Sequence, residues 1–193
     1  MARRVFFSFQ YDDIFRANVV RNHWMTKRDR ESAGFFDSSL WEEAKRKGVI
    51  ALKRMINSGL DGTSVTCVLI GSGTYARPWI RYEILKSFQR GNGMLGVGIN
   101  SIKSRDQTTK PSGPNPFEYV GVSFSESGIT ATLWEKVNGE WREYTEIDGR
   151  ASYQMDPVAA KYRGKGFNLS NFYSLYDWVT EDGYKNFAAW IGD

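Results

Sequence analysis

The sequence is nearly free of side chains that form disulfides or bind transition metals: it has one cysteine, Cys67, and one histidine, His23. A single cysteine cannot form an internal disulfide, and Cys67 lies in the apolar run SVTCVLI, where a small buried side chain is expected. These two absences exclude a disulfide scaffold and argue against a Cys/His metal site. We therefore expect a cytoplasmic protein with no metal ligands.

Long apolar runs and blocks of like charge are also missing. The first residues, MARRVFFSFQYDD, become polar too early for a signal peptide, and no stretch approaches the roughly 20 apolar residues of a membrane span. The formal net charge is only +4, and no nucleic-acid motif accompanies it. We thus expect neither a membrane nor a nucleic acid as partner.

Aromatic residues, by contrast, are abundant. They make up 15% of the 193 residues and include seven tryptophans, whose rings pack in cores but also stack on planar ligands. The length suits one domain over residues 1–193 with a sizeable insertion. We expect a core at about 3–100, a loop and hairpin insertion at about 101–150, and a C-terminal helical segment at about 168–191.

Apolar strands and amphipathic helices alternate over the first hundred residues. The expected strands are 3–9, 33–38, 63–71 and 94–100. The first expected helix is capped by Asp12 or Asp13 and buries Phe15, Val19, Val20 and Trp24; the others run from 39 to about 58 and from Pro78 onward, with Ile80, Ile84 and Phe88 on the buried face. Because the strands are continuously apolar, this order predicts an α/β fold, a doubly wound, flavodoxin-like parallel sheet.

The second half of the chain has a different character. A polar loop with three prolines follows Asn100, and the pair Asn138-Gly139 then predicts a two-residue hairpin turn. That turn sets Glu135 opposite Arg142 and Leu133 opposite Tyr144 in an appended antiparallel hairpin. The end of the chain predicts a C-terminal helix in two parts, with Phe172, Leu175, Tyr176 and Val179 before a break at Asp182-Gly183 and Tyr184, Phe187 and Ile191 after it.

Ligands of open parallel sheets bind beyond the carboxyl ends of the strands, which here carry FQYDD, FFDSS and GSGTYARPW. A phosphoacceptor domain of this architecture needs an aspartate after the third strand, and none is there. The glycines in Gly71-Ser72-Gly73 depart from both nucleotide-binding fingerprints, and the simpler interpretation is that they let the chain turn tightly. Neither motif identifies the ligand.

Glu83 lies four residues after Trp79, so both side chains share one face of the expected helix, at the border between core and solvent. Two interpretations remain open on spacing alone. Glu83 is either a solvated residue that pairs with Lys86, or a carboxylate beside an aromatic wall in an active site.

The motifs in their order resemble the TIR domain, in particular its bacterial branch from the Thoeris antiphage system. The resemblance rests on Ser8-Phe9 at the end of the first strand, Ser72 after the third, and the Trp-x-x-x-Glu of Trp79 and Glu83. It covers roughly residues 3–100 and extends to GPNPFEY at 113–119 and YDWVTEDGY at 176–184.

This resemblance implies an NAD⁺ glycohydrolase or cyclase that makes a cyclic ADP-ribose-type signal for a separate effector protein. NAD⁺ is then the substrate, no further cofactor is needed, and the protein can form a homo-oligomer. The alternatives are a non-catalytic scaffold that acts by self-association and a nucleotide sensor without turnover.

The resemblance also assigns roles to residues. Glu83 becomes the catalytic carboxylate, and the other implied site residues are Phe9, Tyr11 and Trp79 for stacking, Ser8 and Ser72 for hydrogen bonds to ribose or phosphate, Phe36 and Asp37 on the loop over the site, and Phe6 behind it. The sequence departs from many animal TIR enzymes at Gln10-Tyr11, where basic residues often occur. That departure puts phosphate binding by this loop in doubt.

Overall fold

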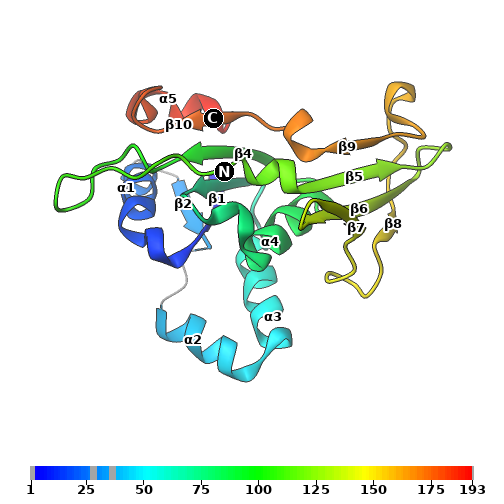
Figure 1. Ribbon diagram of the computed structural model, residues 1–193, viewed down its shortest axis with the longest axis horizontal. Helices are drawn as coiled ribbons and strands as arrows, with labels where there is room; N and C mark the ends of the chain where they lie inside the picture. Colours follow the sequence, from blue (N-terminus) through cyan, green and yellow to red (C-terminus); the bar gives the residue numbers. More distant parts are fainter. Residues whose placement is uncertain (1–2, 27–29, 35–37, 193) are drawn as a thin grey trace.

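A computed structural model describes residues 3–26, 30–34 and 38–192, and a five-stranded parallel sheet forms its centre (Figure 1). The strands are β1 (Arg3–Phe9), β2 (Arg30–Ala33), β3 (Val65–Ile70), β4 (Gly93–Gly98) and β10 (Leu175–Asp177), in the order β10-β4-β3-β1-β2 with every neighbouring pair parallel. This order changes direction between β1 and β3, as in flavodoxin-like folds. The predicted doubly wound α/β class is confirmed.

Helices cover both faces of this sheet. One face packs against α1 (Ile14–Met25) and α5 (Gly183–Trp190), whose Trp24 and Phe187 join Phe7 and Leu69 in one buried cluster. The other face packs against α3 (Val49–Leu60) and α4 (Pro78–Gln89). Side chains of β1 alternate between the two faces of the sheet, and both faces are covered by apolar side chains of helices. This is why the sequence of β1 is continuously apolar.

Three predicted details of the core are wrong. The described second strand, β2, covers 30–33 and a helix begins at Ser38, whereas a strand was predicted at 33–38; residues 35–37 of that prediction lie outside the described residues. The predicted helix from 39 to about 58 is two helices, α2 (Ser38–Lys47) and α3, because Gly48 takes a left-handed φ of 98° between them. Phe15, expected in the core, is 39% exposed and lies under Arg105. Figure 1 shows α2 and α3 extending away from the sheet at the lower end of the molecule.

The C-terminal segment differs most from the prediction. Residues 172–179 do not form a helix: Leu175–Asp177 is the edge strand β10, which pairs with β4, and only Gly183–Trp190 is helical. The apolar side chains in this stretch serve different surfaces. Phe172 joins the aromatic group of the second sheet, whereas Trp178 is fully buried under α5. The apolar residues of 172–179 therefore only resemble a helical pattern, because they pack against two different parts of the molecule.

The insertion forms a second, antiparallel sheet rather than a lone hairpin. Its strands are β5 (Val120–Phe124), β6 (Thr130–Val137), β7 (Glu140–Glu143), β8 (Ser152–Gln154) and β9 (Gly166–Asn168), with the order β7-β6-β5-β9 and β8 also on β6. The predicted hairpin is confirmed: Asn138 and Gly139 have φ of 52° and 87°, and Glu135 pairs with Arg142. Five 3₁₀ turns complete the described chain: η1 (Tyr11–Asp13), η2 (Thr74–Ala76), η3 (Pro116–Tyr119), η4 (Ala160–Tyr162) and η5 (Leu169–Asn171).

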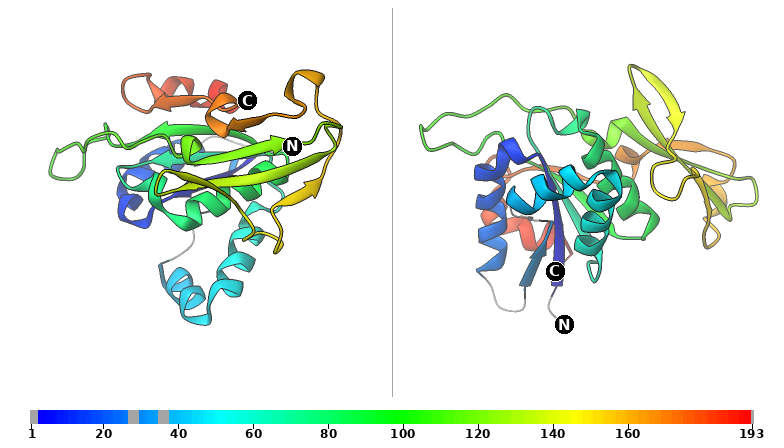
Figure 2. Two further views of the ribbon diagram at one scale, coloured as in Figure 1. Left: turned by 45° about the vertical axis from the view of Figure 1, so that its right-hand side comes forward. Right: turned by 90° about the horizontal axis from the view of Figure 1, so that it is seen from below.

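The antiparallel sheet fixes α4 from outside. It lies beside that helix in both views of Figure 2, and Val122 and Leu133 share a buried cluster with Ile80 and Ile84. An ion pair of 3.1 Å between Arg81 and Glu135 adds a polar contact between α4 and β6. Helix α4 is therefore held between two sheets. No described helix is long and apolar enough to cross a membrane.

Candidate active site

Glu83 is buried where α4 passes β1. The residue is 5% exposed, and the hydroxyl of the fully buried Ser8 donates a hydrogen bond of 2.5 Å to its Oε2. Lys86 instead donates to Gln89, at 2.7 Å. The interpretation of Glu83 as a solvated partner of Lys86 is therefore wrong.

Burial changes the acidity of this carboxyl. Loss of solvation raises the pKa of Glu83 from 4.5 to about 8, and the hydrogen bond from Ser8 offsets part of that rise. The group is consequently protonated in most molecules at pH 7. A strongly raised carboxyl pKa beside a cavity is typical of a catalytic group. A cation that binds in the cavity lowers that pKa, so the carboxyl ionises when a positively charged ligand is present.

The cavity next to Glu83 opens at the carboxyl end of β1 and has a volume of about 210 Å³. Its aromatic walls are Phe9, Tyr11, Trp41 and Trp79, and its charged residues besides Glu83 are Asp12, Lys45 and Arg77. Pockets for drug-sized ligands measure roughly 300–1,000 Å³. This cavity therefore suits one aromatic ring with its sugar, with the remainder of a larger ligand at the mouth.

Five of the predicted site residues gather at this point. Phe9, Tyr11, Trp79 and Glu83 line the cavity, and Ser8 contacts Glu83 from β1. Phe6 is fully buried in the cluster that contains Ile80 and Ile84, behind α4. Phe36 and Asp37 lie outside the described residues.

Ser72 takes another position. It is exposed at the carboxyl end of β3, where its hydroxyl donates to the Pro111 carbonyl at 3.0 Å and accepts from Asn100 Nδ2 at 2.7 Å. It is not among the described residues that line the cavity. Its hydrogen bonds hold the polar loop that follows β4.

Sequence reasoning missed five polar or aromatic residues of the cavity: Gln10, Asp12, Trp41, Lys45 and Arg77. Trp41 and Lys45 are four residues apart on α2, so they share a face. That spacing was visible in the sequence, but the turn at Gly48, which sets the direction of α2, was not.

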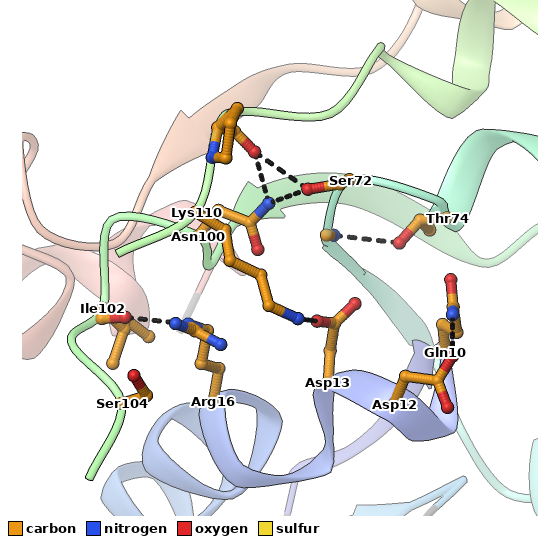
Figure 3. Close-up of polar contacts among 12 residues, drawn as sticks. Gln10, Asp12, Asp13, Arg16, Ser72, Thr74, Asn100, Ile102, Ser104 and Lys110 are labelled. Carbon is orange, nitrogen blue, oxygen red and sulfur yellow. Dashed lines mark hydrogen bonds and ion pairs between the residues drawn. The ribbon is translucent and has the colours of Figure 1, made fainter. Parts of the chain in front are cut away.

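The polar loop after β4 crosses the same edge of the sheet and is fixed there by buried charge (Figure 3). Lys110 reaches Asp13 at 3.2 Å, and Arg16 donates to the carbonyls of Ile102 and Thr108. Asp13 makes no side-chain hydrogen bond as a helix cap, so its predicted capping role is wrong. Its side chain is 4% exposed, and the carboxylate instead holds the loop through Lys110.

The close approach of β3 to this carboxylate gives a stability prediction. A Cβ atom at Gly71 would lie 1.9 Å from Asp13 Oδ2, and Asp13 cannot retreat without losing Lys110. We expect Gly71→Ala to lower the free energy of unfolding by about 1–3 kcal/mol, as overpacking does. Urea unfolding should show no comparable loss for the control Gly93→Ala, whose nearest neighbours would be 3.8 Å away. Equal stability of the two variants would contradict this packing.

Comparison with known proteins gives two similarities. Residues 6–104 match the family described as Thoeris protein ThsB, TIR-like domain. A Bacillus cereus (strain MSX-D12) protein with the provisional name cyclic ADP-D-ribose synthase ThsB1 is 51% identical over 194 residues, which cover 99% of this chain and 100% of that protein. Both similarities include the segments that form the cavity.

Proposed function

The chain belongs to the Thoeris ThsB family of TIR-like proteins, and from this premise we propose that it cleaves NAD⁺ and cyclises the ADP-ribose that remains. Membership confirms the resemblance found in the sequence. The provisional name of the Bacillus cereus relative supports the cyclic product. The observation that carries the proposal is the buried carboxyl of Glu83 beside an aromatic cavity.

The cavity suits the nicotinamide end of NAD⁺. Phe9, Tyr11 and Trp79 offer flat apolar surfaces on which the pyridinium ring can stack. A positively charged ring also lowers the pKa of a neighbouring carboxyl. Binding of NAD⁺ therefore favours loss of the proton from Glu83 to solvent, and the carboxylate forms when the substrate is in place.

The reaction then needs few groups from the protein. The bond between C1′ of the ribose and the ring nitrogen breaks, its electron pair stays on nicotinamide, and the ribose becomes a cation resembling an oxocarbenium ion. The Glu83 carboxylate stabilises this charge electrostatically. A nucleophilic atom of the ADP-ribose portion then bonds to C1′, a proton passes to solvent, and the ring is closed; attack by water, also with loss of a proton, would give ADP-ribose instead.

The raised pKa of Glu83 predicts how the reaction rate depends on pH. Because the pKa in the unliganded protein is about 8, kcat/KM for NAD⁺ should rise nearly tenfold per pH unit from pH 6 to 7 and level off above pH 8. Initial rates of nicotinamide release between pH 6 and 9 measure this. A profile that is flat or falls over that range would contradict an ionised Glu83 as the active form.

A product assay tests the proposed function itself. Purified protein is incubated with NAD⁺ in ¹⁸O-labelled water, with and without lysate from infected cells, and the products are resolved by mass. Cyclisation yields nicotinamide and a species that is one water lighter than ADP-ribose and carries no label. Labelled ADP-ribose alone would show a hydrolase, and unchanged NAD⁺ under both conditions would favour the non-catalytic scaffold.

The product and the chain have further partners in this proposal. The cyclic nucleotide acts on a separate effector protein, so the two proteins need not touch. Assembly of the chain into a homo-oligomer belongs to the same proposal. Size-exclusion chromatography with light scattering, with and without NAD⁺, measures that assembly directly.

A further inference from the structure

The substrate in the proposed function carries a diphosphate, and its negative charge has no cationic partner in the loop after β1. Residues 10 and 11 are glutamine and tyrosine, neither of which is cationic. Asp12 in the same loop adds a negative charge to the cavity wall. A cationic partner for the diphosphate must therefore come from another element.

Two cations from separate elements supply that contact. Lys45 lies in the last turn of α2, and Arg77 is the residue before α4. They are the cationic side chains that line the cavity among residues 3–26, 30–34 and 38–192. They lie far apart in the sequence, so their common position at one cavity is a result of the fold.

Both cations lie at the mouth rather than in the interior. The Lys45 side chain is 48% exposed and that of Arg77 is 52% exposed, whereas Glu83 is 5% exposed. The volume of about 210 Å³ leaves room inside for the nicotinamide ring and its ribose. The next group along the substrate is the diphosphate, which then meets the mouth.

The ion pairs that Lys45 and Arg77 make in this structure are weak enough for a diphosphate to replace them. Lys45 Nζ is 2.9 Å from Glu42 Oε1, and the nearest oxygen of Asp12 is 3.6 Å from Arg77. Ion pairs this exposed contribute little. A diphosphate offers two formal charges and several oxygens, and Arg77 can bind it through two parallel hydrogen bonds.

We propose that Lys45 and Arg77 together bind the diphosphate of NAD⁺ and so select a dinucleotide over nicotinamide riboside, an inference that rests on the proposed function. Both residues act in binding. The bond that breaks lies beside Glu83, in the interior of the cavity. Their loss should therefore raise KM for NAD⁺ far more than it lowers kcat.

The test measures binding where turnover does not interfere. NAD⁺ is titrated calorimetrically into Glu83→Gln and into the same protein with Arg77→Gln or Lys45→Gln added. Each added change should weaken binding about fivefold and both together about twentyfold, as for partly exposed charged contacts. Affinity for nicotinamide riboside, which lacks phosphate, should change less than twofold.

Arg46→Gln is the matched control. Arg46 is exposed on α2 next to Lys45 and is not among the described residues that line the cavity, so it removes the same charge without touching the diphosphate. A general effect of net charge would weaken binding equally in all three variants and would overturn the inference. Unchanged NAD⁺ affinity in both Arg77→Gln and Lys45→Gln would also overturn it.

Failure of this inference can be told from failure of the proposed function. If Glu83→Gln releases nicotinamide at the wild-type rate, the proposed function is wrong whatever the cations do. If Glu83→Gln is inactive but its affinity for NAD⁺ does not change when Lys45 or Arg77 is replaced, only the proposed diphosphate contact is refuted. A parallel measurement of KM and kcat in the Arg77→Gln single variant separates binding from chemistry.

Discussion

Glu83→Gln should lower the rate of nicotinamide release from NAD⁺ by about a thousandfold, the range lost when a single electrostatic or acid–base group is removed from an active site. Glutamine keeps the size of the side chain and an oxygen that accepts the hydrogen bond from Ser8. It cannot become an anion, so the developing charge on the ribose loses its partner. Initial rates at saturating NAD⁺ measure the effect.

The control for this experiment is Glu143→Gln. Glu143 is exposed on β7, in the antiparallel sheet, and is not among the described residues that line the cavity, so its variant loses the same charge outside the site. Its variant should release nicotinamide at the wild-type rate. Equal activity of Glu83→Gln and the wild type, with the fold intact by circular dichroism, would refute the catalytic assignment.

The same substitution should make the protein more stable, by an amount that grows with pH. Between the unfolded pKa of 4.5 and the folded value of about 8, folded Glu83 keeps a proton that the unfolded chain releases. The folded wild type therefore loses stability as pH rises through this interval. Glutamine does not titrate, so the variant does not lose stability as the pH rises.

The expected gain is large for one side chain. At about 1.36 kcal/mol per pH unit, Glu83→Gln should exceed the wild type by roughly 3–5 kcal/mol at pH 8, and by little at pH 5. Urea unfolding of both proteins at several pH values gives the difference. A gain that does not change between pH 5 and 8 would mean that Glu83 titrates normally in the folded protein.

Loss of activity together with a gain in stability would separate two explanations of burial. A carboxyl that served only the fold would cost stability when its charge is removed. A carboxyl buried for catalysis is held by the surrounding structure where its ionised form is poorly solvated. Replacing it with a neutral side chain removes that cost and raises the free energy of unfolding. Both effects on one residue would therefore identify Glu83 as functional.

The parallel core could be predicted because its signals are local. Continuously apolar strands such as β3 and the turn pair Asn138-Gly139 specify structure within a few residues of themselves. The edge strand β10 could not, since Leu175–Asp177 becomes a strand only through pairing with β4, some 80 residues earlier in the chain. The break at Gly48 likewise needs its φ of 98°, which a helical apolar pattern does not reveal.

The site shows the same division. Helical spacing placed Glu83 at the border of the core and, taken alone, favoured the solvated interpretation; only the family resemblance indicated an active-site carboxylate. Burial is decided by β1 and by Ser8, which lies 75 residues away in sequence. Lys45 and Arg77 were missed because two helix ends meet at one cavity only after the chain has folded.

The most direct test of the central claim is the ionisation of Glu83 itself, followed by ¹³C NMR of side-chain carboxyl groups, with the Glu83 signal assigned by its loss in Glu83→Gln. Without ligand, the carboxyl should titrate near pH 8, and an uncleavable NAD⁺ analogue should lower that pKa because the pyridinium charge favours the carboxylate. A carboxyl that titrates near pH 4.5 and does not respond to the analogue would contradict the account.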